Sequence, residues 1–192
     1  MRPVFAVASI LLLLCTLVFG VPPWQQASHA SGLPLVEQNQ VKAVFLYNFL
    51  HFVSWPAELA RPGQEQVIAI LGDSPVQQAL TDLVAKVEEK ERIALRVLSL
   101  GPYREGMDLS PCHILFVGAS EKNSMARIVA SFRNRPVLTV ADTESFLSAG
   151  GMIALLEQQN RIRYHINRKA ASEAGLRLSS QLLKSAAAVQ DE

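Results

Sequence analysis

The stretch Val67-Ile68-Ala69-Ile70-Leu71, followed at once by Gly72-Asp73-Ser74-Pro75, decides the fold predicted for this chain. A continuous apolar run of this length is typical of a strand buried on both faces, and such strands occur mostly in parallel sheets. Gly72 allows a sharp exit, Ser74 is a suitable helix cap, and Pro75 fits the first turn of a helix. The apolar residues that follow recur at helical spacing: Val76, Leu80, Leu83, Val84 and Val87. The stretch therefore predicts a strand-turn-helix unit.

The same pattern recurs along most of the chain. Further strands are predicted at residues 93–100, 113–117 and 137–140, and a hairpin at residues 152–156 and 161–166 around Gln158-Gln159-Asn160. Helices are predicted after the strands at residues 113–117 and 137–140 and at residues 168–174 and 179–189, whereas residues 101–111 are predicted to be irregular. Alternating strands and helices favour an α/β fold. We expect a three-layer α/β/α sandwich with a Rossmann-like, open and mostly parallel sheet of five or six strands and an antiparallel edge hairpin.

The N-terminal segment has the features of a secretory signal peptide. After Met1-Arg2, residues 4–18 are almost wholly apolar, and Ser28-His29-Ala30 offers small residues where signal peptidase reads them. An uncleaved membrane anchor is the alternative, but the apolar run is short for a bilayer span. We expect a signal peptide at residues 1–30, a flexible lead-in at 31–40 and a single domain at 41–190, exported to the periplasm.

Charge and cysteine content narrow the class of protein. The chain holds 18 Lys and Arg residues against 17 Asp and Glu residues, and removal of the signal peptide takes away Arg2, so the balance becomes even. Without basic clusters there is no electrostatic footprint for nucleic acid. Cys112 is the one cysteine beyond the signal peptide, so no intrachain disulfide is expected. We interpret Cys112 as a small buried thiol; an intermolecular or redox-sensing thiol is the alternative.

Residues 41–55 predict a helix with two apolar faces, ended by Pro56. One face carries the apolar residues expected in the core, while Tyr47, His51 and Trp55 fall on the other side at about 100° per residue. Either both faces are buried, or the second face is a dimer or partner surface, since aromatic residues with little charge mark interface cores.

Motifs for chemistry are scarce. There is no dinucleotide-binding or P-loop glycine pattern and no nucleophile elbow, and the histidines show no metal-ligand spacing with one another or with Cys112. Asp73, Gly118 and Asp142 follow predicted strands at the sheet edge where open α/β proteins bind ligands, so they form a possible pocket. An Asp before a helix more often caps it. We expect no catalytic residue, metal or cofactor.

Several segments resemble the YfiR-like family of secreted bacterial proteins in order and spacing over nearly all of the mature chain. The most specific are the first predicted helix and the C-terminal Gly-Leu-x-Leu-Ser-Ser-x-Leu-Leu run. The segments are Val41-Lys42-Ala43-Val44-Phe45-Leu46-Tyr47-Asn48-Phe49, Leu71-Gly72-Asp73-Ser74-Pro75, Cys112-His113-Ile114-Leu115-Phe116, Val137-Leu138-Thr139-Val140-Ala141-Asp142, Gly150-Gly151-Met152-Ile153, Gly175-Leu176 and Leu178-Ser179-Ser180-Gln181-Leu182-Leu183.

The resemblance implies a regulatory function. Its best understood members are periplasmic proteins that repress an inner-membrane diguanylate cyclase by contacting its periplasmic sensor portion, and an outer-membrane lipoprotein can relieve that repression by sequestration. Members look like homodimers of α/β domains without a catalytic site. Some relatives hold further cysteines that form intradomain disulfides. In this chain only Cys112 remains in the mature part, so redox control through an internal bridge is not expected.

The sequence thus favours a non-enzymatic periplasmic regulator of cyclic-di-GMP signalling and biofilm formation that acts by protein contact. We expect Tyr47, His51, Trp55, Leu182 and Leu183 to lie at a partner or dimer interface. The alternatives are a small-molecule-binding or hydrolytic protein with its site at the strand ends, and an accessory to a sensor kinase or an outer-membrane receptor. The identity of the partner is left open by the sequence.

Overall fold

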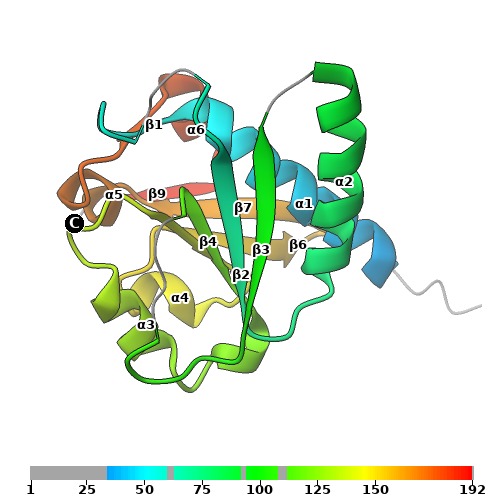
Figure 1. Cartoon of the computed structure of the whole chain (residues 1–192). Coiled ribbons are helices and arrows are strands. Elements are labelled where there is room, and N and C mark those ends of the chain that lie inside the picture. The colour runs from blue at the N-terminus through cyan, green and yellow to red at the C-terminus, as the bar shows by residue number, and fades with distance from the viewer. Residues whose placement is uncertain (1–33, 60–62, 92–93, 108–111, 192) are drawn as a thin grey trace, which may run out of the picture. The chain divides into compact units, whose positions relative to one another are not determined.

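The computed structural model describes residues 34–59, 63–91, 94–107 and 112–191. Its centre is a seven-stranded sheet in the order β3-β2-β4-β5-β6-β7-β9 (Figure 1). The strands of this sheet are β2 (Gln66–Leu71), β3 (Leu95–Gly101), β4 (Ile114–Val117), β5 (Leu138–Ala141), β6 (Ile153–Gln158), β7 (Arg161–Asn167) and β9 (Ala188–Gln190). Strands β3 to β6 are parallel, β6 and β7 form the antiparallel hairpin, and β7 and β9 are parallel. The predicted fold class is confirmed, with more strands than the five or six expected.

The strand-turn-helix unit at the start of the sheet is as predicted. The side chains from Val67 to Leu71 are all buried, as a central strand covered on both faces requires. Gly72 leaves the strand with φ +84°, a conformation that favours glycine. Helix α2 (Val76–Glu91) then returns over the sheet with Val76, Leu80 and Val84 buried beneath it. The hairpin between β6 and β7 turns at Gln159 and Asn160, both with positive φ, as a type I′ turn requires.

Helices cover both faces of the sheet (Figure 1). One core lies between the sheet and the layer of α1 (Leu35–Phe52), α2 and α6 (Ser180–Ser185). The second core lies on the other face, beneath α3 (Met125–Ser131) and α4 (Ser145–Ser148), and includes Cys112. The turn η2 (Ala119–Glu121) follows β4, and α5 (Arg168–Glu173) follows β7. The sandwich places α1 and α6 side by side over the hairpin end of the sheet.

Helix α1 differs from its predicted bounds at both ends. It begins at Leu35, so the lead-in predicted at residues 31–40 is wrong for its second half. Buried Gln38 holds this turn to the sheet, because its Nε2 donates to Glu157 Oε2 over 3.0 Å. The helix ends at Phe52 because the chain then pairs as β1 (Val53–Ser54) with β8 (Arg177–Leu178).

The C-terminal helix predicted at residues 179–189 is correct only in its first half. Ser179 caps α6, since its Oγ accepts from the Leu182 N–H over 3.2 Å. After Ser185 the backbone becomes extended, and β9 pairs with the second half of β7 in the register His165 to Ala188. The run of alanines there favours a helix locally, but strand pairing overrides that weak preference.

The predicted signal peptide at residues 1–30 lies outside the described residues. Within the described part of the chain, no helix is long and apolar enough to span a bilayer.

Candidate functional site

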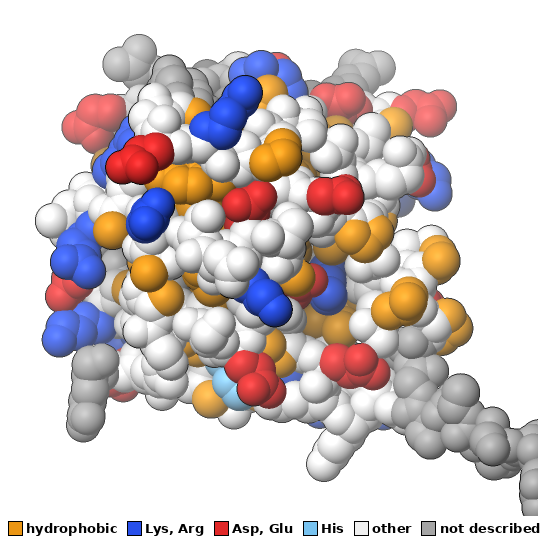
Figure 2. All heavy atoms as spheres, turned by 90° about the horizontal axis from the view of Figure 1, so that it is seen from below, with side chains coloured by type: hydrophobic (Ala, Val, Ile, Leu, Met, Phe, Trp, Pro, Cys, Tyr) orange, Lys and Arg blue, Asp and Glu red, His pale blue; other side chains and the backbone are white. Residues whose placement is uncertain are grey.

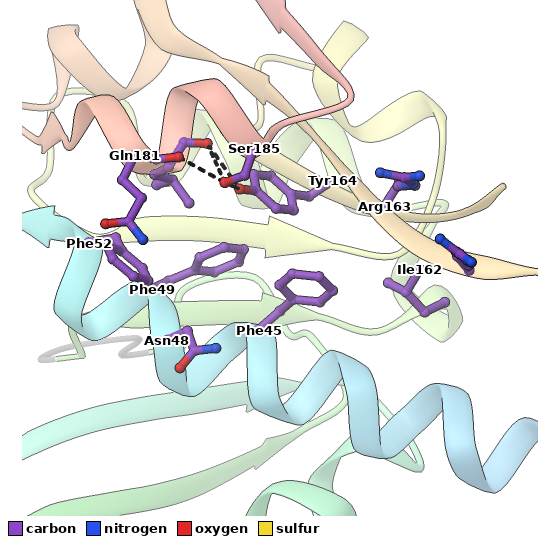
Figure 3. A pocket seen from close by; sticks show the side chains of 11 residues that line it. Phe45, Asn48, Phe49, Phe52, Ile162, Arg163, Tyr164, Gln181 and Ser185 are labelled. Atoms are coloured by element: carbon purple, nitrogen blue, oxygen red, sulfur yellow. Dashed lines mark hydrogen bonds between the residues drawn. The ribbon is translucent and has the colours of Figure 1, made fainter.

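A hollow of about 330 Å³ lies between α1, β7 and α6, and we call it the aromatic groove (Figure 3). Four aromatic side chains form much of its surface, with arginine and amide side chains around them. The lining residues are Phe45, Asn48, Phe49 and Phe52 from α1, Arg161, Ile162, Arg163 and Tyr164 from β7, and Gln181, Leu182 and Ser185 from α6.

Helical and strand periodicity place these side chains together. Phe45, Phe49 and Phe52 recur at four and three residues, so they project from one flank of α1 toward α6 (Figure 3). On β7, Ile162 and Tyr164 alternate with exposed Arg161 and Arg163, as a strand with one buried face requires. Arg161 and Arg163 are nevertheless among the residues that line the groove, so it has an apolar floor and a basic rim.

The aromatic rings hold one another in place. The Tyr164 ring packs edge-on against Phe45 and Phe49, with centroids 5.3 and 5.6 Å away, and the Phe45 and Phe49 rings stack at 6.1 Å. Such pairs add about 0.5–1.5 kcal/mol each beyond the area that they bury. The floor is therefore preformed, and a ligand would not need to order it.

Tyr164 also fixes α6, which forms one side of the groove. Its hydroxyl donates to the Leu182 carbonyl over 2.9 Å and forms a second hydrogen bond with Ser185 Oγ (Figure 3). Because Tyr164 is buried, this connection satisfies its hydroxyl and ties α6 to the sheet. No carboxylate is among the lining residues given above, so the charge of the groove is positive. An apolar side chain next to an acidic group would suit this surface.

The five predicted interface residues do not form one surface. Leu182 is buried in the wall of the aromatic groove, whereas half-buried Leu183 lines a different hollow beside α5. Tyr47 and His51 lie together on the outer side of α1, with ring centroids 4.9 Å apart. Trp55 is only 8% exposed and packs edge-on against His113 at 5.6 Å. Since α1 ends at Phe52, Trp55 turns inward, and the surface position predicted for it is wrong.

The structure brings Asp73, Gly118 and Asp142 to one edge of the sheet, after β2, β4 and β5. Asp142 pairs with Lys42 of α1 over 2.7 Å, and both side chains are largely buried. A Cβ on Gly118 would lie 3.1 Å from the Asp73 carbonyl oxygen, so this corner is closely packed. Asp142 therefore has a structural role in fixing α1. Within the described residues, no group of three or more His, Cys, Asp or Glu side chains could hold a metal ion.

Cys112 is buried, as expected, and it lies in the core on the α3 and α4 side of the sheet. Burial raises the pKa of its thiol to about 12, against a smaller lowering effect of the nearby Arg135. The thiol is therefore protonated at neutral pH, and thiolate chemistry requires the charged form.

Sequence reasoning missed most of the groove. The alternation of arginines with apolar residues on β7 was visible, as was the apolar face of α1. Nothing in the sequence indicated that α6 would lie against both. On the face shown in Figure 2, acidic and basic side chains are interspersed with apolar ones rather than gathered by sign, in line with the even charge balance.

The fold and the groove define a small α/β domain with a preformed aromatic hollow on its surface. The chain belongs to the YfiR/HmsC-like family, which matches residues 39–187. Membership points to a periplasmic regulator connected with cyclic-di-GMP signalling, in a family that is regulatory rather than catalytic.

Two solved structures are similar to this chain, and the first of them supports the fold alone. A conserved domain protein from Vibrio cholerae O1 biovar eltor is similar with a TM-score of 0.52 and 10% identity, over 83% of this chain and 61% of that one. The ABC domain from Streptococcus pneumonia in complex with L-Trp gives a TM-score of 0.46 and 14% identity, over 65% of this chain and 55% of that one. This chain thus matches little more than half the length of either protein. A search of curated proteins found no match.

Proposed function

We propose that this protein is a non-enzymatic periplasmic regulator that represses an inner-membrane diguanylate cyclase through direct contact with its periplasmic sensor portion. The observation that carries the proposal is the aromatic groove, considered together with family membership. The groove offers a preformed apolar floor and two exposed arginines. Its lining holds no acid/base pair and no activated nucleophile of the kind that a hydrolytic site needs.

The physical role of the groove is to anchor the partner. An apolar side chain of the sensor portion would fill the space above Phe45 and Tyr164, and a carboxylate beside it would meet Arg161 and Arg163. Buried aromatic contacts supply most of the binding free energy in interfaces of this kind, whereas charges at the rim steer the encounter. Binding would hold the sensor in an inactive arrangement and so shift its equilibrium.

Export and release complete the proposal. Residues 1–30 would be cleaved as a signal peptide, which delivers the mature protein to the periplasm. An outer-membrane lipoprotein that competes for the protein would relieve repression by mass action. Mass spectrometry of the exported protein tests the cleavage, and an intact N-terminus would contradict it.

Charge reversal at the groove rim tests the contact. Arg161→Glu with Arg163→Glu should leave the fold intact, because both side chains are exposed. In a strain that lacks the gene and is complemented with the variant, cyclic-di-GMP should rise to the level of the deletion. Arg127→Glu is the matched control, because Arg127 is an exposed arginine of α3 in the opposite layer. Normal repression by the rim variant would refute the groove as the contact.

A second substitution separates the contact from a strand-end pocket. The Asp73 side chain is exposed, and the backbone N–H of Asp73 donates to Ser120 Oγ over 3.0 Å. Asp73→Asn should therefore leave both stability and repression unchanged. A general base or metal ligand would lose about 10²–10⁴-fold in rate on this change. Loss of repression in Asp73→Asn, with the rim variant active, would move the function to the strand ends and favour a small-molecule-binding or hydrolytic protein.

A further inference from the structure

The outer edge of β7 is paired along only part of its length. Strand β6 pairs with one side of β7 in a continuous register from Arg161 to Ile166. On the other side β9 pairs with residues 165–167, and the described part of the chain supplies no strand there for residues 161–164. The first half of β7 therefore borders the sheet at the aromatic groove (Figure 3). The free edge of a sheet presents unpaired backbone groups that can pair with another strand.

Hydrogen bonds near the paired end of β7 show which backbone groups face this open edge. The Asn167 N–H donates to the Met152 carbonyl on the β6 side over 2.8 Å, whereas the Tyr164 carbonyl accepts from the Ala187 N–H on the β9 side over 2.9 Å. Backbone groups alternate in direction along a strand, so the N–H and the carbonyl of Ile162 face the open edge with Tyr164. Among the described residues, no hydrogen bond engages the two Ile162 groups on that side.

The aromatic groove extends along this edge and is not confined to one face of the sheet. Successive side chains of a strand point to opposite faces. Ile162 and Tyr164 are buried in the core beneath α1, so Arg161 and Arg163 belong to the other face. All four residues nevertheless line the same hollow. The open backbone groups of Ile162 thus lie beside both the apolar floor and the basic rim of the groove.

A strand added at this edge would need side chains that alternate in character. Residues opposite each other in neighbouring strands share a face of the sheet. On the α1 face, an apolar side chain would lie near Ile162 and Phe45, which both line the groove (Figure 3). On the other face, an acidic side chain would lie beside Arg161 or Arg163. Neither arginine forms an ion pair within the described residues, so each is available to a carboxylate of the incoming strand.

The opposite edge of the sheet, at β3, lacks this combination. Arg96 of β3 pairs with Glu65 over 2.8 Å, so its charge is already matched within the chain. Ser99 of the same strand donates through its Oγ to Gln77 Oε1 over 2.8 Å. The charge and the hollow both distinguish the β7 edge as the place for an acidic and apolar segment.

We propose that the partner's sensor portion binds as an added β-strand on residues 161–164 of β7, in line with β9, through an extended segment in which apolar and acidic residues alternate. This binding mode rests on the proposed function, because it names the form in which the partner enters the aromatic groove. The N–H and the carbonyl of Ile162 set the register of the segment, and the groove and the rim arginines select its side chains.

Backbone-methylated peptides test the strand pairing on the mature protein. The probe is the acetylated and amidated hexapeptide Val-Glu-Leu-Glu-Val-Glu, with one isomer N-methylated on its apolar residues and another on its glutamates. An N-methyl group blocks pairing only on the side to which that N–H points. One isomer should lose about tenfold or more in affinity, while the other binds like the parent peptide. Loss with the apolar set indicates an antiparallel strand, and loss with the glutamate set a parallel one. Equal affinity of the two isomers, or no binding of the parent at about 1 mM, would overturn the proposal.

Amide hydrogen exchange locates the pairing on β7. In the free protein the Ile162 N–H should exchange faster than the N–H of Arg163, which faces β6 and is the internal control. With the parent peptide at about ten times its dissociation constant, Ile162 exchange should slow about tenfold, because only the unbound fraction exchanges. The Arg163 rate should stay the same. An unchanged Ile162 rate with peptide bound would refute strand addition at this edge.

The rim variant shows whether the added strand and the proposed function stand or fail together. Arg161→Glu with Arg163→Glu should abolish both peptide binding and repression, and the matched control Arg127→Glu should keep both. Lost repression in the rim variant, with equal binding of the two methylated isomers to the wild type, would reject the added strand and keep the groove as the contact. Normal repression in a rim variant that no longer binds the peptide would reject the cyclase contact and keep the strand-binding edge.

Discussion

Replacement of His113 by Phe tests how the segment after α1 is held to the sheet. His113 is 7% exposed, just before β4. Its Nδ1 accepts from the Val67 N–H over 3.2 Å, and its Nε2 lies 3.1 Å from the Leu59 carbonyl oxygen. A backbone N–H only donates and a carbonyl only accepts, so the proton is on Nε2. The neutral ring thus joins the start of β2 to the segment at Leu59.

The size of the effect follows from these two bonds. His113→Phe keeps an aromatic ring against Trp55, so the edge-on packing at 5.6 Å can persist. The buried Val67 N–H would lose its side-chain acceptor, which costs about 1–3 kcal/mol. Leu59 is half-buried, and water can reach its carbonyl, so that loss is nearer 0.5–1.5 kcal/mol. We expect a total decrease of about 2–4 kcal/mol in the free energy of unfolding.

Urea unfolding of the mature protein measures this decrease. With a denaturant slope of about 2 kcal/mol per molar, the midpoint should fall by about 1–2 M at an unchanged slope. His165→Phe is the matched control, because His165 bonds to Gln158 on the exposed side of the hairpin; it should change stability by about 0.5 kcal/mol or less. If His113→Phe costs no more than the control, the two buried hydrogen bonds do not contribute as described.

Three further measurements test the packing. Burial raises the pKa of the Cys112 thiol to about 12. At about pH 8, near the ordinary thiol pKa, a disulfide reagent should therefore label Cys112 only as fast as the protein opens. Rapid labelling would contradict its burial. Gly72→Ala should lower the free energy of unfolding by about 3 kcal/mol or more. The new Cβ would lie 2.5 Å from Ser120 Oγ, and the backbone at this position has φ +84°, which favours glycine. The matched Gly63→Ala, at φ +77° with nothing within 4 Å, should cost about 1–2 kcal/mol by thermal unfolding. Asp142→Asn should cost about 1–3 kcal/mol because it leaves Lys42 largely buried without its anion. Lys42→Met in the same chain should recover most of that loss. If the two substitutions instead lower the free energy of unfolding by the sum of their single effects, the pair is not coupled.

The parallel part of the sheet was predictable because the local sequence pattern alone indicates each strand. The runs at Val67–Leu71 and Ile114–Val117 are continuous and apolar, and turn residues bound them. The hairpin was predictable for the same reason, since polar residues and alternation mark its turn and its exposed face. What failed were the places where a distant segment decides the local structure. Pairing with Arg177 ends α1 before Trp55, and pairing with β7 converts residues 188–190 into a strand.

The candidate site was less predictable than the fold, and the reason is physical. A catalytic motif binds a phosphate or a metal with residues at fixed short spacing, so it leaves a pattern in the sequence. The aromatic groove is assembled from residues 45–52, 161–164 and 181–185, and each part alone looks like an ordinary amphipathic element. Local periodicity shows which side chains are apolar, but not which elements meet.

Helix α1 shows why its two apolar faces were difficult to interpret. A helix that packs only on a sheet needs one apolar stripe, yet α1 contacts the sheet through Leu46, the groove through Phe45 and solvent through Val44. Three consecutive positions thus serve three environments, and a two-sided wheel cannot distinguish them. Burial separates them: Leu46 is inaccessible, Phe45 is half-buried and Val44 is 42% exposed. If the groove contacts the cyclase, a groove variant should lose repression and keep its fold.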